Sequence, residues 1–344
     1  MSNKMTRMLK SKERSSVWTF LLISYSIITI GMLNPAGARE MNTQEKIVIA
    51  TVIYPAEWSE KNALLLVESI RAFAGSLAET PIWCYVPQYG KEVSRETVRR
   101  LNDLNVAIIP FDIDIEVARF FFAADIRAAW LAESTAIDKT ELLAWLGANT
   151  IILKQPDAFL LSAEKQLGYR PVHHINVGSE FKSGLDPFWA FVYDYCKVPE
   201  DRIFPMETHV DRKVIRPYFN AGMIITRPEN KLMRTWHDTF FKVYQKPELR
   251  AFYEQDERYV IFIHQALLSG IILNMFAKDE IQELPRDYNY PLHLYDEDIT
   301  ADRPSSIDDV VTLRHEGFYQ DPQWMDKMPA SDRLKQWLAE RLSQ

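Results

Sequence analysis

Residues 142–153 read LLAWLGANTIIL, and this stretch decides the fold. An apolar run, Leu142–Leu146, is followed by the small and polar residues Gly147–Asn149 and then by a second apolar run, Thr150–Leu153. Apolar runs of this length, bounded by small or polar residues, are typical of buried strands. We therefore expect a strand, a kink and a second strand here, preceded by a long helix at Phe120–Ser134.

Strands and helices alternate from residue 46 up to this stretch. The β-branched run KIVIATV, Lys46–Val52, predicts a fully buried strand. Further predicted elements are helices at Glu60–Leu77 and Ser94–Leu104 and strands at Pro81–Val86 and Val106–Pro110. The alternation predicts an α/β protein with a mixed, mainly parallel sheet flanked by helices. We expect Lys46–Val52 and Leu146–Leu153 to share that sheet, with ligands bound at the carboxyl ends of its strands.

The second half of the chain is less regular. YFNAGMIIT at Tyr218–Thr226 predicts a strand with a kink, and Val310–Arg314 predicts a short strand. Helices are expected at Leu232–Val243, Tyr259–Leu268 and Ser331–Leu342. The sequence has no internal repeat, low-complexity tract or Gly/Ser linker. We therefore expect a single domain over residues 46–330, followed by an amphipathic C-terminal helix within residues 331–344.

Residues 1–38 have the pattern of an export signal. A basic head precedes the apolar run at residues 17–33, and Ala36-Gly37-Ala38 matches a small-x-small cleavage site. Residues 39–45 form a short lead-in. If the signal is cleaved, the protein is periplasmic or secreted. If it is retained as an anchor, the protein is a lumenal type II membrane protein, associated with the membrane through residues 17–33.

Composition excludes several classes of function. The net charge of −7 over 344 residues argues against a nucleic-acid partner, which would require a basic surface. The two cysteines, Cys84 and Cys196, have no metal-type spacing, and two buried thiols are the simpler interpretation than a disulfide. The sequence also lacks a Gly-x-Ser-x-Gly elbow, so a serine hydrolase is poorly supported.

Three short segments carry a pattern characteristic of one enzyme family. FNAG at Phe219–Gly222 matches its Phe-Asn-Ala-Gly strand, and HEGFYQ at His315–Gln320 matches its His-x-Gly-x-x-Lys motif with Gln in place of Lys. Leu146–Lys154 matches its Leu-Asp-x-Asp-Thr-aliphatic strand, with both Asp residues replaced. Over roughly residues 46–325 the chain resembles GT-A-fold glycosyltransferases, nearest to the retaining glycogenin and lipopolysaccharide galactosyltransferase group.

The resemblance implies transfer of a sugar from a nucleotide diphosphate, whose leaving group is neutralised by a divalent ion held by two Asp and one His. Here Gly147 and Asn149 replace the two Asp, and only Asn149 and His315 remain as weak metal candidates. Hard divalent ions favour carboxylate ligands, so we expect no cofactor, and Mn²⁺ is disfavoured. Basic side chains could neutralise the charge instead. The candidates are Arg127, Arg212, Lys213, Arg216 and Arg314.

The resemblance also implies a set of site residues. Gln265 and Asn220 are the catalytic candidates. The residues expected to bind donor or substrate are Tyr54, Arg127, Gly147, Asn149, Ala221, Gly222, Arg216 and His315. We expect Gly147, Asn149, Asn220, Gly222, Gln265 and His315 to line one cleft. If His315 can ligate, Gly147→Asp with Asn149→Asp should create Mn²⁺ affinity.

Two functions remain open at this point. The first is a glycosyltransferase-like protein with an altered donor site, in which transfer without metal is one possibility. Its partners would be a nucleotide- or lipid-linked sugar donor and a glycan acceptor. The alternative is a catalytically inactive GT-A domain that binds a glycan or a protein. A hydrolase built on the same sheet is a weaker third reading.

Overall fold

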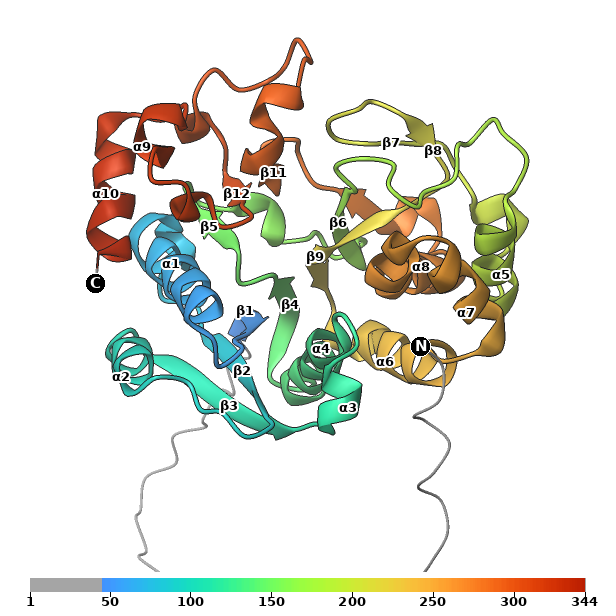
Figure 1. Cartoon of the computed structure of the whole chain (residues 1–344), viewed down its shortest axis with the longest axis horizontal. Helices are drawn as coiled ribbons and strands as arrows, with labels where there is room; N and C mark the ends of the chain where they lie inside the picture. The colour runs from blue at the N-terminus through green and yellow to red at the C-terminus, as the bar shows by residue number, and fades with distance from the viewer. Residues whose placement is uncertain (1–44, 344) are drawn as a thin grey trace, which may run out of the picture. The chain divides into compact units, whose positions relative to one another are not determined.

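The centre of the protein is a seven-stranded mixed sheet in the computed structural model, which describes residues 45–343 (Figure 1). The strand order across this sheet is β10-β6-β9-β4-β1-β2-β3. The predicted export signal at residues 1–38, with its apolar run at residues 17–33, lies outside the described residues. Export and membrane association through this segment therefore remain predictions.

The first half of the chain builds the parallel part of the sheet. Its strands are β1 (Glu45–Val52), β2 (Ile82–Gln88), β3 (Val106–Asp112) and β4 (Thr140–Leu146). β1 pairs in parallel with both β2 and β4, and β2 pairs in parallel with β3. The helices between them are α1 (Glu57–Phe73), α2 (Arg95–Asp103), α3 (Ile115–Ala118) and α4 (Ala123–Ala136). The predicted alternation of strand and helix is confirmed, with boundaries shifted by a few residues.

β9 (Phe219–Thr226) makes the sheet mixed. It runs antiparallel between β4 on one side and β6 (Leu167–Pro171) on the other. The pairing with β6 shifts register between Tyr169, opposite Ile224, and Pro171, opposite Phe219. Residues 220–223 of β9 therefore have no regular partner on β6. Beyond β6, β10 (Ile281–Glu283) restores parallel pairing at the edge.

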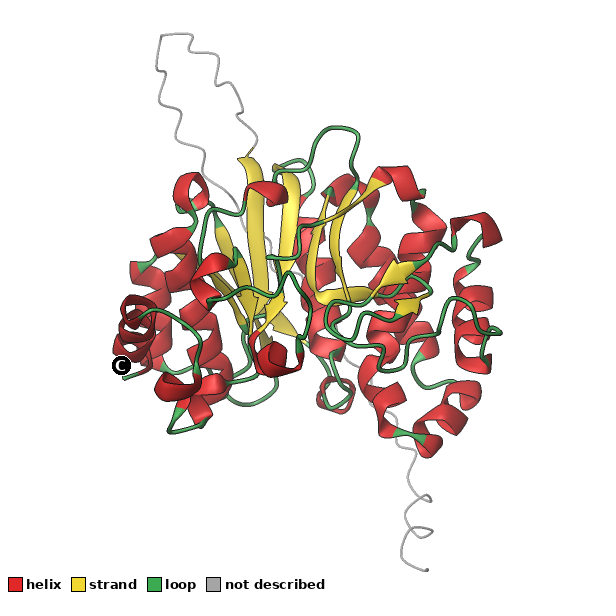
Figure 2. Cartoon of the chain, turned by 90° about the horizontal axis from the view of Figure 1, so that it is seen from above, coloured by secondary structure: helices red, strands yellow, loops and turns green. Residues whose placement is uncertain are grey.

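Helices cover both faces of the sheet (Figure 2). One face packs on α4, α5 (Pro187–Cys196), α6 (Leu232–Val243) and α8 (Glu257–Met275), and the other on α1 and α2. The aromatic cluster of α5 belongs to the first core, where Phe188 and Trp189 are buried. Among residues 45–343, α8 is the one helix long and apolar enough to cross a membrane. Its buried run Ile263–Leu273 is that of a core helix.

The strand after the kink does not belong to the main sheet, so the expectation of one shared sheet is wrong for this part. β5 (Thr150–Ile152) pairs antiparallel with β12 (Thr312–Arg314), which in turn pairs with β11 (Tyr290–Pro291). The break occurs because the Gly147 N–H donates to the Gly222 carbonyl at 2.9 Å, while the Thr150 N–H turns back to the Gly147 carbonyl at 3.1 Å. The turn places the end of β12 beside the kink.

The remaining elements complete the C-terminal half. They are the two-stranded pair β7 (Met206–Glu207) and β8 (Val214–Ile215) and the helices α7 (Pro247–Gln255), α9 (Trp324–Lys327) and α10 (Asp332–Leu342). Ser331 caps α10 as predicted, accepting from the Leu334 N–H. Cys84 and Cys196 are free thiols, and burial raises the pKa of each to about 12.

Candidate functional site

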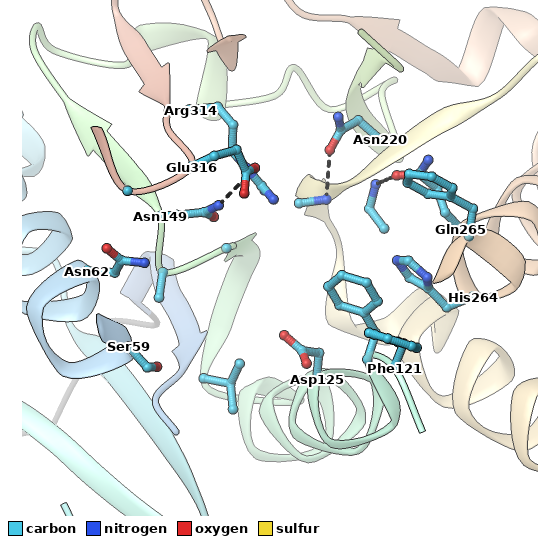
Figure 3. A pocket seen from close by; sticks show the side chains of 18 of the residues that line it. Ser59, Asn62, Phe121, Asp125, Asn149, Asn220, His264, Gln265, Arg314 and Glu316 are labelled. Atoms are coloured by element: carbon cyan, nitrogen blue, oxygen red, sulfur yellow. Dashed lines mark hydrogen bonds and ion pairs between the residues drawn. The ribbon is translucent and has the colours of Figure 1, made fainter. Parts of the chain in front are cut away.

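A cavity of about 780 Å³ opens at the carboxyl ends of β1 and β4. Its walls come from the kink after β4, the start of β9, the N-terminal turns of α4, the middle of α8 and the segment after β12 (Figure 3). Parallel strands end at one edge of a sheet, and the loops that follow them converge there. The edge of the sheet at which the sequence predicts ligand binding therefore carries this cavity.

Seven of the predicted site residues line this cavity, together with a further tyrosine. They are Gly147, Asn149, Asn220, Ala221, Gly222, Gln265 and, at the end of β1, Tyr54, with Tyr319 on the segment after β12. The functional roles assigned to them remain predictions. The structure adds how each is held.

The Arg314 guanidinium lies against the two glycines of the cavity. A Cβ atom on Gly147 would lie 2.9 Å from Arg314 Nη1, and one on Gly222 would lie 2.1 Å from it. Neither glycine has a positive φ, so these positions require the absence of a side chain rather than backbone freedom. Only hydrogen at these two positions leaves room for the guanidinium.

Arg314 has one carboxylate neighbour in the described part of the chain. Within residues 45–343, Glu316 is the one carboxylate within 4 Å, with Oε1 at 3.5 Å from Arg314 Nε. Asn149 Nδ2 donates to the same Glu316 oxygen at 3.4 Å. After burial, the charge on Arg314 is a further cause of the lowered pKa of neighbouring histidines, namely His173, His264, His293 and His315. Burial and the nearby guanidinium together therefore favour the neutral form of these histidines.

The start of β9 presents polar groups to the cavity. Asn220 Oδ1 accepts from the Gly222 N–H at 2.9 Å, and Gln265 Oε1 accepts from the Ala221 N–H at 2.9 Å. Both amide oxygens therefore hold the bend of β9, and the side-chain NH₂ groups remain as donors for a ligand. Gln265 was predicted to be catalytic. The contact with Ala221 shows that it holds the backbone of β9 at the site.

Asp125 faces the cavity from α4, on the side opposite Arg314 (Figure 3). It accepts a hydrogen bond from the Tyr54 hydroxyl. Burial is the main cause that raises the pKa of Asp125 to about 6, and the Tyr54 hydrogen bond and the charge on Arg314 act against it. The pKa of Tyr54 is also raised by burial, so its hydroxyl stays a donor. Asp125 can therefore exchange a proton near neutral pH.

Exposed aromatic side chains also line the cavity. Trp58 on α1 is 54% exposed and stacks on Tyr54, while Phe121 is 52% exposed. Phe122 adopts a left-handed conformation with φ of 61° and stacks on His264, with ring centroids 4.1 Å apart. A bulky residue seldom takes this conformation, and here it starts α4 so that its ring lies over the cavity. Aromatic faces of this kind can pack on sugar rings.

Two predicted binding residues lie outside the cavity lining. Arg127 stacks on Trp130 at 4.4 Å, and its Nη1 lies 3.1 Å from Nε2 of His237 on α6. Residues two apart on a helix are about 200° apart around its axis, so α4 turns Arg127 away when Asp125 faces the cavity. Arg216 instead donates to Ser179 Oγ at 3.0 Å and to the carbonyl of Ser183 at 2.7 Å.

His315 is adjacent to the kink but its side chain is not part of the cavity lining. Its backbone N–H donates to the Asn149 carbonyl at 3.0 Å. The side chain is buried, and its Nδ1 accepts from the Gly317 N–H at 3.1 Å. Burial and the charge on Arg314 lower its pKa to about 3, so the ring is neutral with its proton on Nε2. The predicted role of His315 at the cleft remains a prediction.

These residues do not fit the divalent ion that the resemblance implies. With Nδ1 accepting a hydrogen bond and Nε2 protonated, His315 has no free lone pair for a metal. Over residues 45–343 no group of three or more His, Cys, Asp or Glu side chains is placed to hold an ion. The position flanked by Gly147 and Gly222 receives a guanidinium, which repels a cation.

The carboxylates Asp125 and Glu316 line the site but were not predicted from the sequence, and Arg314 was predicted only as one of five basic candidates. Asp125 has no motif around it, although it lies two residues before Arg127 on the helix that the resemblance singled out. Glu316 lies inside the His-x-Gly motif, whose variable position carried no signal. Arg314 was one of five basic candidates, and only the pairing of β12 with β5 separates it from the others.

The chain belongs to the Rhodobacterales glycosyltransferase domain family, whose model matches residues 50–264. The match includes the kink, Asp125 and β9, and it ends before Gln265 and Arg314. A search of curated proteins finds no match.

Several solved glycosyltransferases have distantly similar structures. The galactosyltransferase LgtC, in complex with donor and acceptor sugar analogues, is 14% identical, with 86% of this chain and 94% of that chain covered and a TM-score of 0.48. Mouse xyloside xylosyltransferase 1 is 12% identical, with coverage of 78% and 97% and a TM-score of 0.43. The bifunctional glycosyltransferase WbbM is 14% identical, with coverage of 90% and 53% and a TM-score of 0.45. The family assignment rests on the family model.

Proposed function

We propose that this glycosyltransferase transfers a sugar from a phosphate-activated donor to an acceptor hydroxyl, without a divalent ion. The observation that carries the proposal is the cavity at the ends of β1 and β4, which is lined by Asn220, Gln265, Asp125 and Arg314. Asp125 lies in the wall of this cavity, and burial raises its pKa to about 6. A carboxylate with such a pKa in a cavity is a candidate for proton transfer. This feature favours the enzyme over the inactive binding module.

Asp125 is the proposed proton acceptor. Two carboxylates line the cavity, and Glu316 already pairs with Arg314. In the proposed step the bond from the anomeric carbon to the phosphate oxygen breaks, and its electron pair leaves with the phosphate. The acceptor oxygen forms the new bond to that carbon as its proton passes to Asp125. Asn220 and Gln265 orient the sugar through their side-chain NH₂ groups.

The proposed donor is a sugar ester of a phosphate or diphosphate, carried by a nucleoside or a lipid, and the proposed acceptor is a glycan. The charged end is recognised in either case, and the exposed rings of Trp58 and Phe121 are surfaces for the sugar or the carrier. We also propose that the protein is exported, as residues 1–38 predict. Export would favour a lipid-linked donor in a compartment that lacks nucleotide sugars.

The direct test is a transfer assay on the full chain with panels of nucleotide-linked and lipid-linked sugars, each with and without excess EDTA. We expect sugar transfer, or donor hydrolysis in the absence of acceptor, from members of one panel, with rates that EDTA leaves unchanged within about two-fold. Abolition by EDTA with recovery on Mn²⁺ would restore ordinary metal-dependent transfer. Glycan binding without turnover of any donor would instead support the inactive module.

A further inference from the structure

We infer that Arg314 is a built-in cation that takes the place of a divalent ion at the donor phosphate, and that Gly147 and Gly222 are glycines because its guanidinium fills their side-chain space. This inference rests on the proposed function and specifies how the donor is held. It concerns a residue outside the matched family segment, residues 50–264.

The first argument is spatial. Gly147 begins the turn that follows β4, and Gly222 lies on β9. The two residues meet because the Gly147 N–H donates to the Gly222 carbonyl at 2.9 Å. In both cases Arg314 Nη1 is the nearest or equal-nearest atom to an added Cβ, at 2.9 Å and 2.1 Å. One guanidinium therefore accounts for two missing side chains. A side chain at Gly147, which the resemblance assigns to a carboxylate, would have to displace the guanidinium.

The second argument concerns how Arg314 is held. It is the last residue of β12, and its register opposite Thr150 of β5 fixes its backbone beside the kink. The following turn is braced by the His315 Nδ1 contact with the Gly317 N–H. Its side chain is 19% exposed, and Glu316 at 3.5 Å is its one ion-pair partner within residues 45–343. The terminal N–H groups of Arg314 therefore line the cavity and can donate hydrogen bonds to a ligand.

The third argument is chemical. A guanidinium remains charged at all physiological pH values and presents paired N–H donors that match two phosphate oxygens. In a partly enclosed site such a fixed positive charge stabilises the negative charge that develops on a leaving phosphate. An arginine carries one charge where a divalent ion carries two. The carboxylates that would hold an ion are absent here, so less negative charge has to be neutralised at the site itself.

The test is calorimetric titration of the full chain with inorganic pyrophosphate, UDP and farnesyl diphosphate, in excess EDTA. We expect the unmodified protein to bind pyrophosphate, and Arg314→Gln to weaken binding by about 100-fold because a charged, two-pronged contact is lost. Arg314→Lys should weaken binding by about 10-fold, since charge is kept but the planar fork is lost. The tighter of UDP and farnesyl diphosphate identifies the carrier.

A second variant tests the space argument without removing the arginine. Gly222→Ala should displace the flexible guanidinium and weaken pyrophosphate binding by about 10-fold, with an unchanged melting temperature. Its matched control is Gly184→Ala, because no atom lies within 4 Å of a Cβ at Gly184. The control for charge is Arg212→Gln, since Arg212 pairs with Glu207 at 2.7 Å and is not among the residues that line the cavity. Both controls should bind as the unmodified protein does.

The outcomes separate the two proposals. If the unmodified chain transfers sugar or binds a diphosphate and folded Arg314→Gln binds it equally well, the inference about Arg314 is wrong and the proposed function stands. Loss of binding in EDTA would also overturn the inference, since an ion would then be the cation. If the unmodified chain neither binds any of the three probes nor transfers sugar, the proposed function fails and the inference fails with it.

Discussion

The two sides of the cavity carry different kinds of charged group. On the side of the kink and β9, a permanently charged arginine rests on two glycines, and no titratable group is needed. On the side of α4, Asp125 is a carboxylate whose pKa is raised by burial to about 6, held by the Tyr54 hydroxyl. One side carries a fixed cation and the other a group that can exchange a proton.

The difference between these sides indicates a division of roles. A leaving phosphate requires a charge that does not depend on pH, whereas an acceptor hydroxyl requires a group that accepts a proton. Because Figure 3 shows Arg314 and Asp125 on opposite sides of the pocket, a sugar between them would have its phosphate toward one and its acceptor toward the other. The predictions below test this division, beginning with the largest expected effect on activity.

Asp125→Asn should lower kcat/KM by about 100-fold, because the amide keeps a contact with Tyr54 but cannot accept the proton. In the unmodified enzyme kcat/KM should rise with pH through about 6, where Asp125 ionises, and the variant should lack this limb. A pH profile of both proteins measures the effect. Activity that falls with pH across this range would show that the protonated form of Asp125 is the working one.

The same variant has an opposite expected effect on stability. The pKa of Asp125 is raised on folding, so the folded state holds the proton more tightly than the unfolded chain between about pH 4 and 6. The corresponding stability is present at low pH and is lost as pH rises through about 6. Asp125→Asn should remove this loss and raise the melting temperature at pH 7.5. A lower melting temperature of the variant at pH 7.5 would contradict the idea that burying the ionised Asp125 carboxylate destabilises the fold.

Gly147→Asp with Asn149→Asp restores the acidic pair that the resemblance implies. The structure changes the expected result for two reasons. A carboxylate at 147 meets Arg314, and His315 accepts the Gly317 N–H at Nδ1, which leaves its proton on Nε2. We expect no gain of Mn²⁺ affinity and a loss of about 10-fold in pyrophosphate binding, since the new carboxylates compete for the guanidinium. Titration with both ligands decides this. Tight Mn²⁺ binding by the double variant would show that Arg314 moves aside readily.

Phe121→Ser tests the apolar rim on the α4 side. Phe121 is largely exposed, so its removal should leave the melting temperature unchanged. We expect KM for the acceptor to rise by about 5-fold, because a ring that packs on a sugar contributes on the order of 1 kcal/mol. Steady-state kinetics with varied donor and varied acceptor measure both constants. An effect confined to the donor would place the donor on this rim instead.

Glu133→Ala is the control for Asp125→Asn, because both residues are carboxylates on α4 whose pKa is raised by burial. Glu133 is buried, and its two oxygens accept from the Met233 and Arg234 N–H groups at 2.9 Å, where they cap the start of α6. Removing it leaves those donors without a partner and should lower the free energy of unfolding by about 2–3 kcal/mol. We expect kcat/KM of the folded protein to stay within about two-fold. A large loss of activity would mean that α4 transmits changes at Glu133 to Asp125.

Much of the fold could be predicted from the sequence, because buried strands and helices require apolar residues at characteristic spacings. The run Lys46–Val52, the stretch 142–153 and the helix Leu232–Val243 carry their element type in their own residues. The kink at Gly147–Asn149 was also visible, as small residues between apolar runs. The partner of the second run was not visible, since strand pairing depends on segments more than 150 residues apart, as for β5 and β12.

The sequence by itself determined the α/β class, and it predicted the edge of the sheet at which the cavity opens. Both depend on the order of apolar and small residues along the chain, which burial constrains directly. Only the tertiary structure decided that Arg314, not Arg127 or Arg216, lines the cavity and that Asp125 faces it. Side-chain direction follows from helix phase and long-range strand pairing, and neither is contained in the identity of the residue itself.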